Sequence, residues 1–183
     1  MTPAEPDDRS LIATIAKTGD PRAFHLLYQR HSGVLFAMAA RLLDDRSDAE
    51  DAVHDTWLRA MQASGRFHGA AMVRTWLVGI LINRVRELRR ARPLECLDAM
   101  PDLAEPGAVT PDRALEAIDV SRALAEMPER YREVVVLHDI QGFTHDEVAA
   151  ALGIAPGTSR SQLVRGREWL RRALHVPLET TDE

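Results

Sequence analysis

The stretch that most constrains the fold runs from Ser47 to Met61 and has the pattern of an amphipathic helix. Ser47 precedes Glu50 by three residues, the spacing of a capping box that satisfies free amides in the first helical turn. Such a helix buries one stripe against other helices, which indicates a helical domain built around it. The predicted buried stripe consists of Ala49, Ala52, Val53, Thr56, Trp57 and Ala60.

The opposite side of this predicted helix is acidic and includes one apolar residue. Asp51 and Asp55 lie one turn apart, a spacing at which like charges cost some helix stability. Leu58 follows one turn after Asp55, outside the apolar stripe. Two interpretations are open at this point: a charged face in contact with water, or a surface that docks on a basic partner protein.

Two further helices are predicted beside this one. Asp20 and Pro21 have the pattern of an N-cap followed by a proline in the first turn, which predicts a helix over about 21–43. Apolar residues at helical spacing predict another over about 72–91, after a short glycine-containing loop at 66–71. Three mutually packed helices would form an N-terminal domain.

A change in composition after the third helix marks a domain boundary. Residues 93–110 contain three prolines and several acids without sustained apolar periodicity, so an extended linker of at most roughly 60 Å is expected. The predicted fold class is all-α, with two small helical domains joined by an extended acidic linker. The expected boundaries are an N-terminal tail at 1–20, a first domain at 21–92, the linker at 93–110, a second domain at 111–175 and a C-terminal tail at 176–183.

The second domain is predicted to contain a helix-turn-helix motif. Thr144 and Glu147 have capping-box spacing before a short helix, Gly153 marks a turn, and an arginine-rich helix follows to about Leu174. In such motifs the first residues of the second helix read base edges in the major groove. Arginine suits guanine and phosphate, and glutamine suits adenine. The candidates are Thr158, Ser159, Arg160, Ser161, Gln162 and Arg165 for bases, with Arg167 on phosphate.

The net charge of −5 is unusual for a nucleic-acid-binding protein, but its distribution is informative. Counting Lys, Arg, Asp and Glu, the net charge is −5 over residues 44–55, +6 over 66–92, −6 over 93–119 and +4 over 157–175. The chain therefore alternates acidic and basic surfaces. Because phosphate attraction supplies most non-specific affinity, we expect weak binding to free DNA until a partner presents both basic surfaces together.

Several protein classes do not fit this sequence. No apolar run approaches the roughly 18 residues of a membrane span, and Met1 to Arg9 lacks the features of a signal peptide. The single Cys96 excludes an intrachain disulfide and gives no zinc-site spacing. A cytoplasmic protein that needs no cofactor is the expected result.

Histidine–aspartate pairs provide one enzymatic alternative. Metal-dependent phosphohydrolases use such a dipeptide, and the chain has pairs beginning at His54, His138 and His145. Each pair falls on or beside a predicted amphipathic helix, where surface or capping roles explain it. No nucleophile elbow or phosphate-binding loop is present in the sequence. We therefore assign no catalytic or metal-binding residue.

Two separate blocks of the sequence resemble a bacterial sigma factor of the extracytoplasmic-function (ECF) group. Their order, the acidic stretch between them and the total length also fit. The block similar to sigma region two includes Ala23–Tyr28, Asp48–Ala60, Arg66–Phe67 and Arg74–Leu77. The block similar to sigma region four includes Met127–Val135, Glu147–Ala149, Leu152–Ile154 and Gly157–Leu163.

The resemblance implies a role for each surface. The acidic helix would dock on core RNA polymerase at the β′ clamp helices, through Asp48, Asp51, His54, Asp55 and Leu58. Region two would melt and read the promoter −10 element, through Arg66, Phe67, His68, Arg74, Asn83, Arg86 and Arg90. Region four would contact the polymerase β flap and read the −35 element with the helix-turn-helix residues named above.

The resemblance also implies partners and leaves one rival open. Core RNA polymerase, promoter DNA and a cognate anti-sigma factor are the expected partners. Ser159 and Gln162 depart from the common pattern and alter the expected base readout, and Ala70-Ala71 stand where a polar residue often caps the −10 helix. The rival is a stand-alone helix-turn-helix regulator whose N-terminal domain serves dimerisation or sensing.

Overall fold

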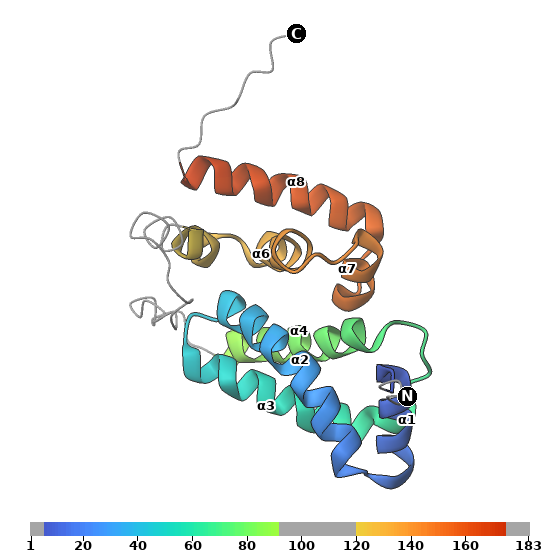
Figure 1. The fold of residues 1–183 in the computed structure, drawn as a ribbon. Coiled ribbons are helices and arrows are strands. Elements are labelled where there is room, and N and C mark those ends of the chain that lie inside the picture. The colour runs from blue at the N-terminus through green and yellow to red at the C-terminus, as the bar shows by residue number, and fades with distance from the viewer. Residues whose placement is uncertain (1–5, 92–119, 175–183) are drawn as a thin grey trace, which may run out of the picture.

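The computed structural model describes residues 6–91 and 120–174, and every regular element in these two ranges is helical. This confirms the all-α prediction for the described part of the chain. Figure 1 shows the N-terminal helices as one layer and the C-terminal helices stacked above it. The elements are α1 (Asp8–Thr18), α2 (Pro21–Leu42), α3 (Arg46–Ala63), η1 (Ser64–Arg66), α4 (Val73–Ala91), a helical segment at 120–126, α6 (Glu129–Val135), the π-helical η2 (Val136–Ile140), α7 (His145–Leu152) and α8 (Pro156–Ala173).

The prediction that residues 1–20 form a tail is wrong over α1. Asp7 caps this helix by accepting a hydrogen bond from the Ser10 amide, and the helix ends at Gly19 in the left-handed conformation. Leu11, Ile12 and Ile15 are buried in the core. The helix has only three apolar residues on its inner face, and it forms because the rest of the domain covers them with a hydrophobic surface.

The start of α3 also differs from the prediction. Asp45, not Ser47, is the N-cap: its Oδ1 accepts from the amides of Ser47 at 2.7 Å and of Asp48 at 3.2 Å. The expected Ser47–Glu50 capping box is therefore wrong, because the helix begins one residue before Ser47 and the Ser47 hydroxyl donates to the Asp45 carboxylate instead of capping the helix. The predicted cap of α2 by Asp20, with Pro21 in its first turn, is confirmed.

The predicted apolar stripe of α3 is confirmed, since all six of its residues are buried. Trp57 anchors it within an aromatic cluster, with its ring centroid 5.6 Å from that of Phe24 and 5.3 Å from that of Tyr28. Together with α2 and α4, this stripe encloses the core of the N-terminal domain.

The helix-turn-helix of the C-terminal domain is confirmed. Both halves of the capping box at Thr144 and Glu147 are present at the start of α7. Gly153, with φ of 69°, ends α7 in a conformation that disfavours other residues and allows the tight turn into α8. On α8, Gly166 is buried against α6, and a Cβ built there would lie 2.5 Å from Val135 Cγ2.

The two domains pack directly against each other, and one cluster of buried apolar residues extends through both. Between α4 and α7, a Cβ built on Gly79 would lie 3.5 Å from the carbonyl oxygen of Ala151, so the backbones approach closely. Arg132 of α6 inserts toward the N-terminal domain, with Nη1 3.6 Å from Asp44 Oδ1. Burial, reinforced by the neighbouring Arg89 charge, lowers the pKa of Arg132 to about 10.

Some predictions fall on residues that the structure does not describe. The linker at 93–110 with Cys96, most of the predicted helix at 111–126 and the C-terminal tail at 176–183 lie outside the described residues.

Candidate protein-docking and nucleic-acid interfaces

The acidic face of α3 points away from the core. Asp51 and His54 are exposed, and Leu58, 49% exposed, is an apolar residue on the same face. Asp48 and Asp55 are half-buried at its margin. With i, i+3, i+4 and i+7 spacing, residues 51, 54, 55 and 58 form one continuous strip on the helix surface.

Asp55 differs from the rest of this strip because it already has a cationic partner. Arg84 of α4 lies beside it, with Nε 2.7 Å from Asp55 Oδ2. Arg84 also approaches Glu87, which accepts two hydrogen bonds from Arg59 at 2.8 and 2.6 Å. These arginines lower the pKa of Glu87 to about 2. The network holds α3 against α4 and keeps the acidic strip in place.

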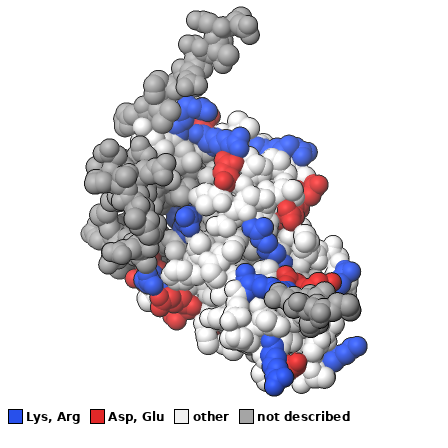
Figure 2. Space-filling model, in the orientation of Figure 1, with Lys and Arg blue, Asp and Glu red and all other residues white. Residues whose placement is uncertain are grey.

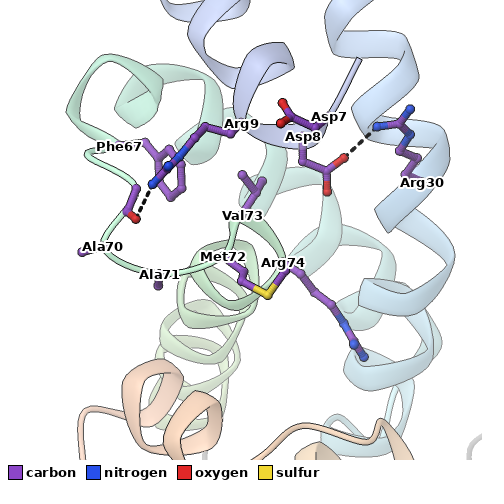
Figure 3. Close-up of a pocket in the computed structure, with 11 residues that line it drawn as sticks. Asp7, Asp8, Arg9, Arg30, Phe67, Ala70, Ala71, Met72, Val73 and Arg74 are labelled. Carbon is purple, nitrogen blue, oxygen red and sulfur yellow. Dashed lines mark hydrogen bonds and ion pairs between the residues drawn. The ribbon is translucent and has the colours of Figure 1, made fainter. Parts of the chain in front are cut away.

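A cavity of about 640 Å³ opens between α1, α2 and the loop that precedes α4 (Figure 3). Phe67 lines it and packs on Trp76, with ring centroids 5.0 Å apart. Arg66, the last residue of η1, and His68, in the loop, are both exposed. The cavity lining combines the Phe67 ring with three arginines, Arg9, Arg30 and Arg74, and two carboxylates, Asp7 and Asp8. An aromatic ring beside guanidinium groups is suited to an unstacked base and its phosphate.

Sequence reasoning missed the α1 and α2 side of this cavity, with Asp7, Asp8, Arg9 and Arg30, and the residues Met72 and Val73. Met72, 70% exposed, lies at its edge, and Arg9 of α1 reaches across to the loop (Figure 3). The signal for α1 was present but short: Leu11, Ile12 and Ile15 at helical spacing, and Asp7 three residues before Ser10.

Part of the basic face of α4 is exposed to water, and another part contacts the C-terminal domain. Asn83 and Arg90 are exposed, as their predicted roles require. Arg86 donates two hydrogen bonds to Glu133 of α6, at 2.9 and 2.7 Å, and Arg74 donates to the carbonyl oxygen of Gln141 at 2.7 Å. In this arrangement, therefore, Arg74 and Arg86 serve the domain interface, and a nucleic-acid strand reaches them only after these contacts break.

The second helix of the helix-turn-helix presents most of its predicted residues outward. Thr158, Arg160, Ser161 and Arg165 are exposed, and Gln162 is half-buried. Figure 2 shows Lys and Arg side chains gathered along the upper edge of the molecule, where Figure 1 places α8. The N-terminal half of α8 thus offers a polar and basic surface of the kind that enters a major groove.

Ser159 is a correction to the predicted base-reading set. Its side chain is fully buried, and its Oγ lies 2.9 Å from Nδ1 of His145 on α7. It therefore joins the two helices of the motif and presents no atom to DNA. The His145 ring stacks on that of His138, with centroids 4.4 Å apart, and burial followed by the nearby positive charges lowers the pKa of His145.

Arg167 is exposed but paired across the motif. Its guanidinium donates to Asp139 at 2.8 and 2.7 Å, which lowers the pKa of that carboxyl group. Arg165 lies 3.5 Å from the hydroxyl oxygen of Tyr131, to which Arg130 also donates. These contacts orient the guanidinium groups of Arg165 and Arg167, whereas Arg160, near the N-terminus of α8, stays exposed.

The described residues contain neither a metal-ligand cluster nor a membrane-spanning helix. No group of three or more His, Cys, Asp or Glu side chains is arranged there to hold a metal ion. No helix in residues 6–91 or 120–174 combines the length and apolarity that crossing a membrane requires.

Comparisons with known proteins identify the family. The model of sigma-70 region 2 matches residues 27–93, and the model of sigma-70 region 4 matches residues 117–170. The chain is 35% identical to the ECF RNA polymerase sigma factor SigM of Mycobacterium tuberculosis, over 93% of this chain and 86% of SigM. This chain belongs to the ECF sigma factors.

Other ECF sigma factors support the same assignment over the whole length. CnrH of Cupriavidus metallidurans is 32% identical over 98% of this chain and 100% of CnrH. The solved structure of CnrH in complex with the cytosolic domain of CnrY has a TM-score of 0.71 and covers 92% of this chain and 97% of CnrH. RpoE of Bartonella quintana in complex with the anti-sigma factor NepR has a TM-score of 0.68, with 28% identity, over 85% of this chain and 98% of RpoE.

The identification decides between a sigma factor and a stand-alone regulator. As an ECF sigma factor, the protein is a transcription initiation factor that binds core RNA polymerase and directs promoter recognition. Most of α2, together with α3 and α4, falls in region 2, and the helix-turn-helix falls in region 4. The rival interpretation as a stand-alone regulator does not account for the region 2 match.

Proposed function

We propose that the acidic strip of α3 is the surface that docks on the β′ clamp helices of core RNA polymerase. Asp51, His54 and Leu58 would make the direct contacts, because they are exposed and the apolar Leu58 lies among charges. Asp48 and Asp55 would act at the margin. For Asp55, the Arg84 ion pair supports a mainly orienting role. The exposed Leu58 set into this acidic strip is the single observation that carries the proposal.

The loop before α4 would capture a base of the −10 element. Phe67 and His68 would stack on unstacked bases, while Arg66, Asn83 and Arg90 would hold the strand. Arg74 and Arg86 would join them once the C-terminal domain moves away from α4. The position of Phe67 in the cavity wall, and the exposure of Arg66, His68, Asn83 and Arg90, support the assignment.

The N-terminal half of α8 would read the −35 element. Thr158, Arg160, Ser161, Gln162 and Arg165 would face the major groove, and Arg167 would hold a phosphate. The buried position of Ser159 removes it from the base-reading set. Contact of this domain with the β flap would place both DNA-binding surfaces on one promoter.

Regulation by an anti-sigma protein fits the similar structures, since CnrH was solved with part of CnrY and RpoE with NepR. We propose a comparable inhibitory partner for this chain. Polymerase and promoter lie in the cytoplasm, so the protein would act there. Its role would be recognition without catalysis of its own.

Charge reversal on α3 tests the docking surface. Asp51→Arg should abolish co-elution with bacterial core RNA polymerase, because it places a cation at the centre of the strip. Glu50→Arg is the matched control: it makes the same charge change on the same helix, about 100° around the axis. The Arg46–Glu50 ion pair that it removes is largely exposed and contributes little. Loss of binding in both variants, or in neither, would contradict the proposed surface. Asp55→Arg is less informative, because it also breaks the Arg84 ion pair.

A further inference from the structure

A hydrogen bond joins α1 to the middle of the loop that precedes α4. Nη2 of Arg9 lies 2.6 Å from the carbonyl oxygen of Gly69, a residue 60 positions later in the chain (Figure 3). Gly69 has φ of 70°, and a Cβ built there would lie 1.9 Å from the same Arg9 nitrogen. The guanidinium therefore lies directly against the backbone at Gly69, where any side chain would displace it.

The residues of α1 on either side of Arg9 are fixed to the rest of the domain. The preceding residue, Asp8, contacts two residues of α2: it forms an ion pair with Arg30 Nη1 at 2.9 Å and a hydrogen bond with His31 Nε2 at 2.6 Å. On the other side, Leu11 and Ile12 are buried in the core. The helix that carries Arg9 is thus fixed to the body of the domain within two residues on either side.

The loop itself has little internal support. Residues 67–72 form no regular secondary structure between η1 and α4. Phe67 is held at one end by its packing on Trp76, and Met72 at the other end is 70% exposed. Between these two ends, the Arg9 hydrogen bond ties the backbone at Gly69 to a rigid element.

We infer that Arg9 is a positioning residue for the −10-reading loop, acting through the Gly69 carbonyl to orient Phe67 and His68 at the cavity. The inference rests on the −10 role proposed above for this loop. It extends that role to α1, which lies outside the residues matched by the region 2 model. Recognition of the captured base would then depend on a side chain that does not touch it.

A direct phosphate contact by Arg9 is the competing explanation, and the two differ in salt dependence. An arginine that neutralises a phosphate contributes to the slope of affinity against salt concentration, so its loss lowers that slope by about one unit. A positioning residue changes base preference and leaves the slope unchanged. Arg9→Lys keeps the charge and N–H donors but lacks the planar guanidinium, so it should restore base preference only in part.

The first measurement is hydrogen exchange on the full-length protein. Arg9→Ala should speed exchange of the amides at 67–72, and Gly69→Ala should do the same. Arg22→Ala serves as the control, because Arg22 is an exposed arginine of α2 that does not line the cavity. Unchanged exchange at 67–72 in Arg9→Ala, or an equal effect in Arg22→Ala, would overturn the inference.

The second measurement uses holoenzyme assembled with bacterial core RNA polymerase and a library of single-stranded DNA with a randomised hexamer. Wild type should enrich particular bases, and Arg9→Ala should reduce the strongest preference roughly five- to tenfold, with an unchanged salt slope. Unchanged preference in Arg9→Ala, or a salt slope lowered by one unit, would overturn the inference. If the wild-type protein shows no base preference, the −10 role of the loop is refuted. That outcome is distinct from the two that overturn the inference, because those are read from the Arg9→Ala variant.

Discussion

Removal of Arg86 is expected to open the interface between the two domains. Arg86 and Glu133 form a two-hydrogen-bond ion pair in which the glutamate side chain is 3% exposed and the arginine side chain 27% exposed. Arg86→Ala would leave the carboxylate buried without its partner. Because the two residues belong to different domains, the carboxylate regains water when the domains separate. The destabilisation should therefore appear as domain opening, with each domain still folded.

The expected magnitude follows from the burial of the pair. Removing one partner of a buried ion pair costs roughly 3–5 kcal/mol. Water reaches the partly exposed Arg86 side, so the lower end of this range applies, at about 3 kcal/mol. Since about 1.4 kcal/mol corresponds to a factor of ten, the open form should gain on the order of 100-fold in population relative to the closed form.

Fluorescence energy transfer between the domains measures this equilibrium. Dyes would be attached at Gln62→Cys and Arg172→Cys, both at exposed positions, in a Cys96→Ser background. Arg86→Ala should lower the transfer efficiency, or lower the urea concentration at which it falls. Glu133→Ala and the double variant complete a mutant cycle, for which we expect a coupling energy of about 1–3 kcal/mol.

Arg84→Ala is the matched control. Arg84 lies on the same helix and forms ion pairs with Asp55 and Glu87, within its own domain. Its removal should leave the interdomain signal unchanged. The reasoning fails if Arg86→Ala opens the domains no more than Arg84→Ala, or if the cycle gives a coupling energy within about 0.5 kcal/mol of zero.

Two further predictions concern the C-terminal domain. Gly166→Ala should destabilise it by roughly 1–3 kcal/mol, because the new methyl group meets Val135, whereas Gly157→Ala, with open space around it, should be neutral or slightly stabilising in thermal unfolding. Equal melting temperatures for the two variants would contradict the close packing of α6 and α8. The lowered pKa of His145 means that the folded state favours the neutral ring, so stability should be complete above pH 6.5 and decline as the pH falls below it. Urea unfolding between pH 5 and 8 should show this decline in wild type and a smaller one in His145→Gln; identical pH profiles would contradict it.

Much of the fold could be predicted from the sequence because helix signals are local. The buried stripe of α3, the cap at Asp20, the capping box at Thr144 and the turn at Gly153 each depend on residues within one or two helical turns. The acidic strip and the outward residues of α8 follow from the same periodicity, since a helix that buries one face exposes the other. Local competition caused one error, at Ser47, where Asp45 is the N-cap instead.

Only the tertiary structure decided which partners the charged and polar side chains have. Periodicity shows that Arg74, Arg86 and Asp55 lie outside the buried stripes of their helices. Their partners, however, belong to elements far away in the sequence, which periodicity does not identify. Ser159 is polar yet buried, because His145 of the neighbouring helix satisfies its hydroxyl group. The helix α1 shows the same limit: its three apolar residues are too few to predict a helix, and they become core only where the rest of the domain supplies the surface that covers them.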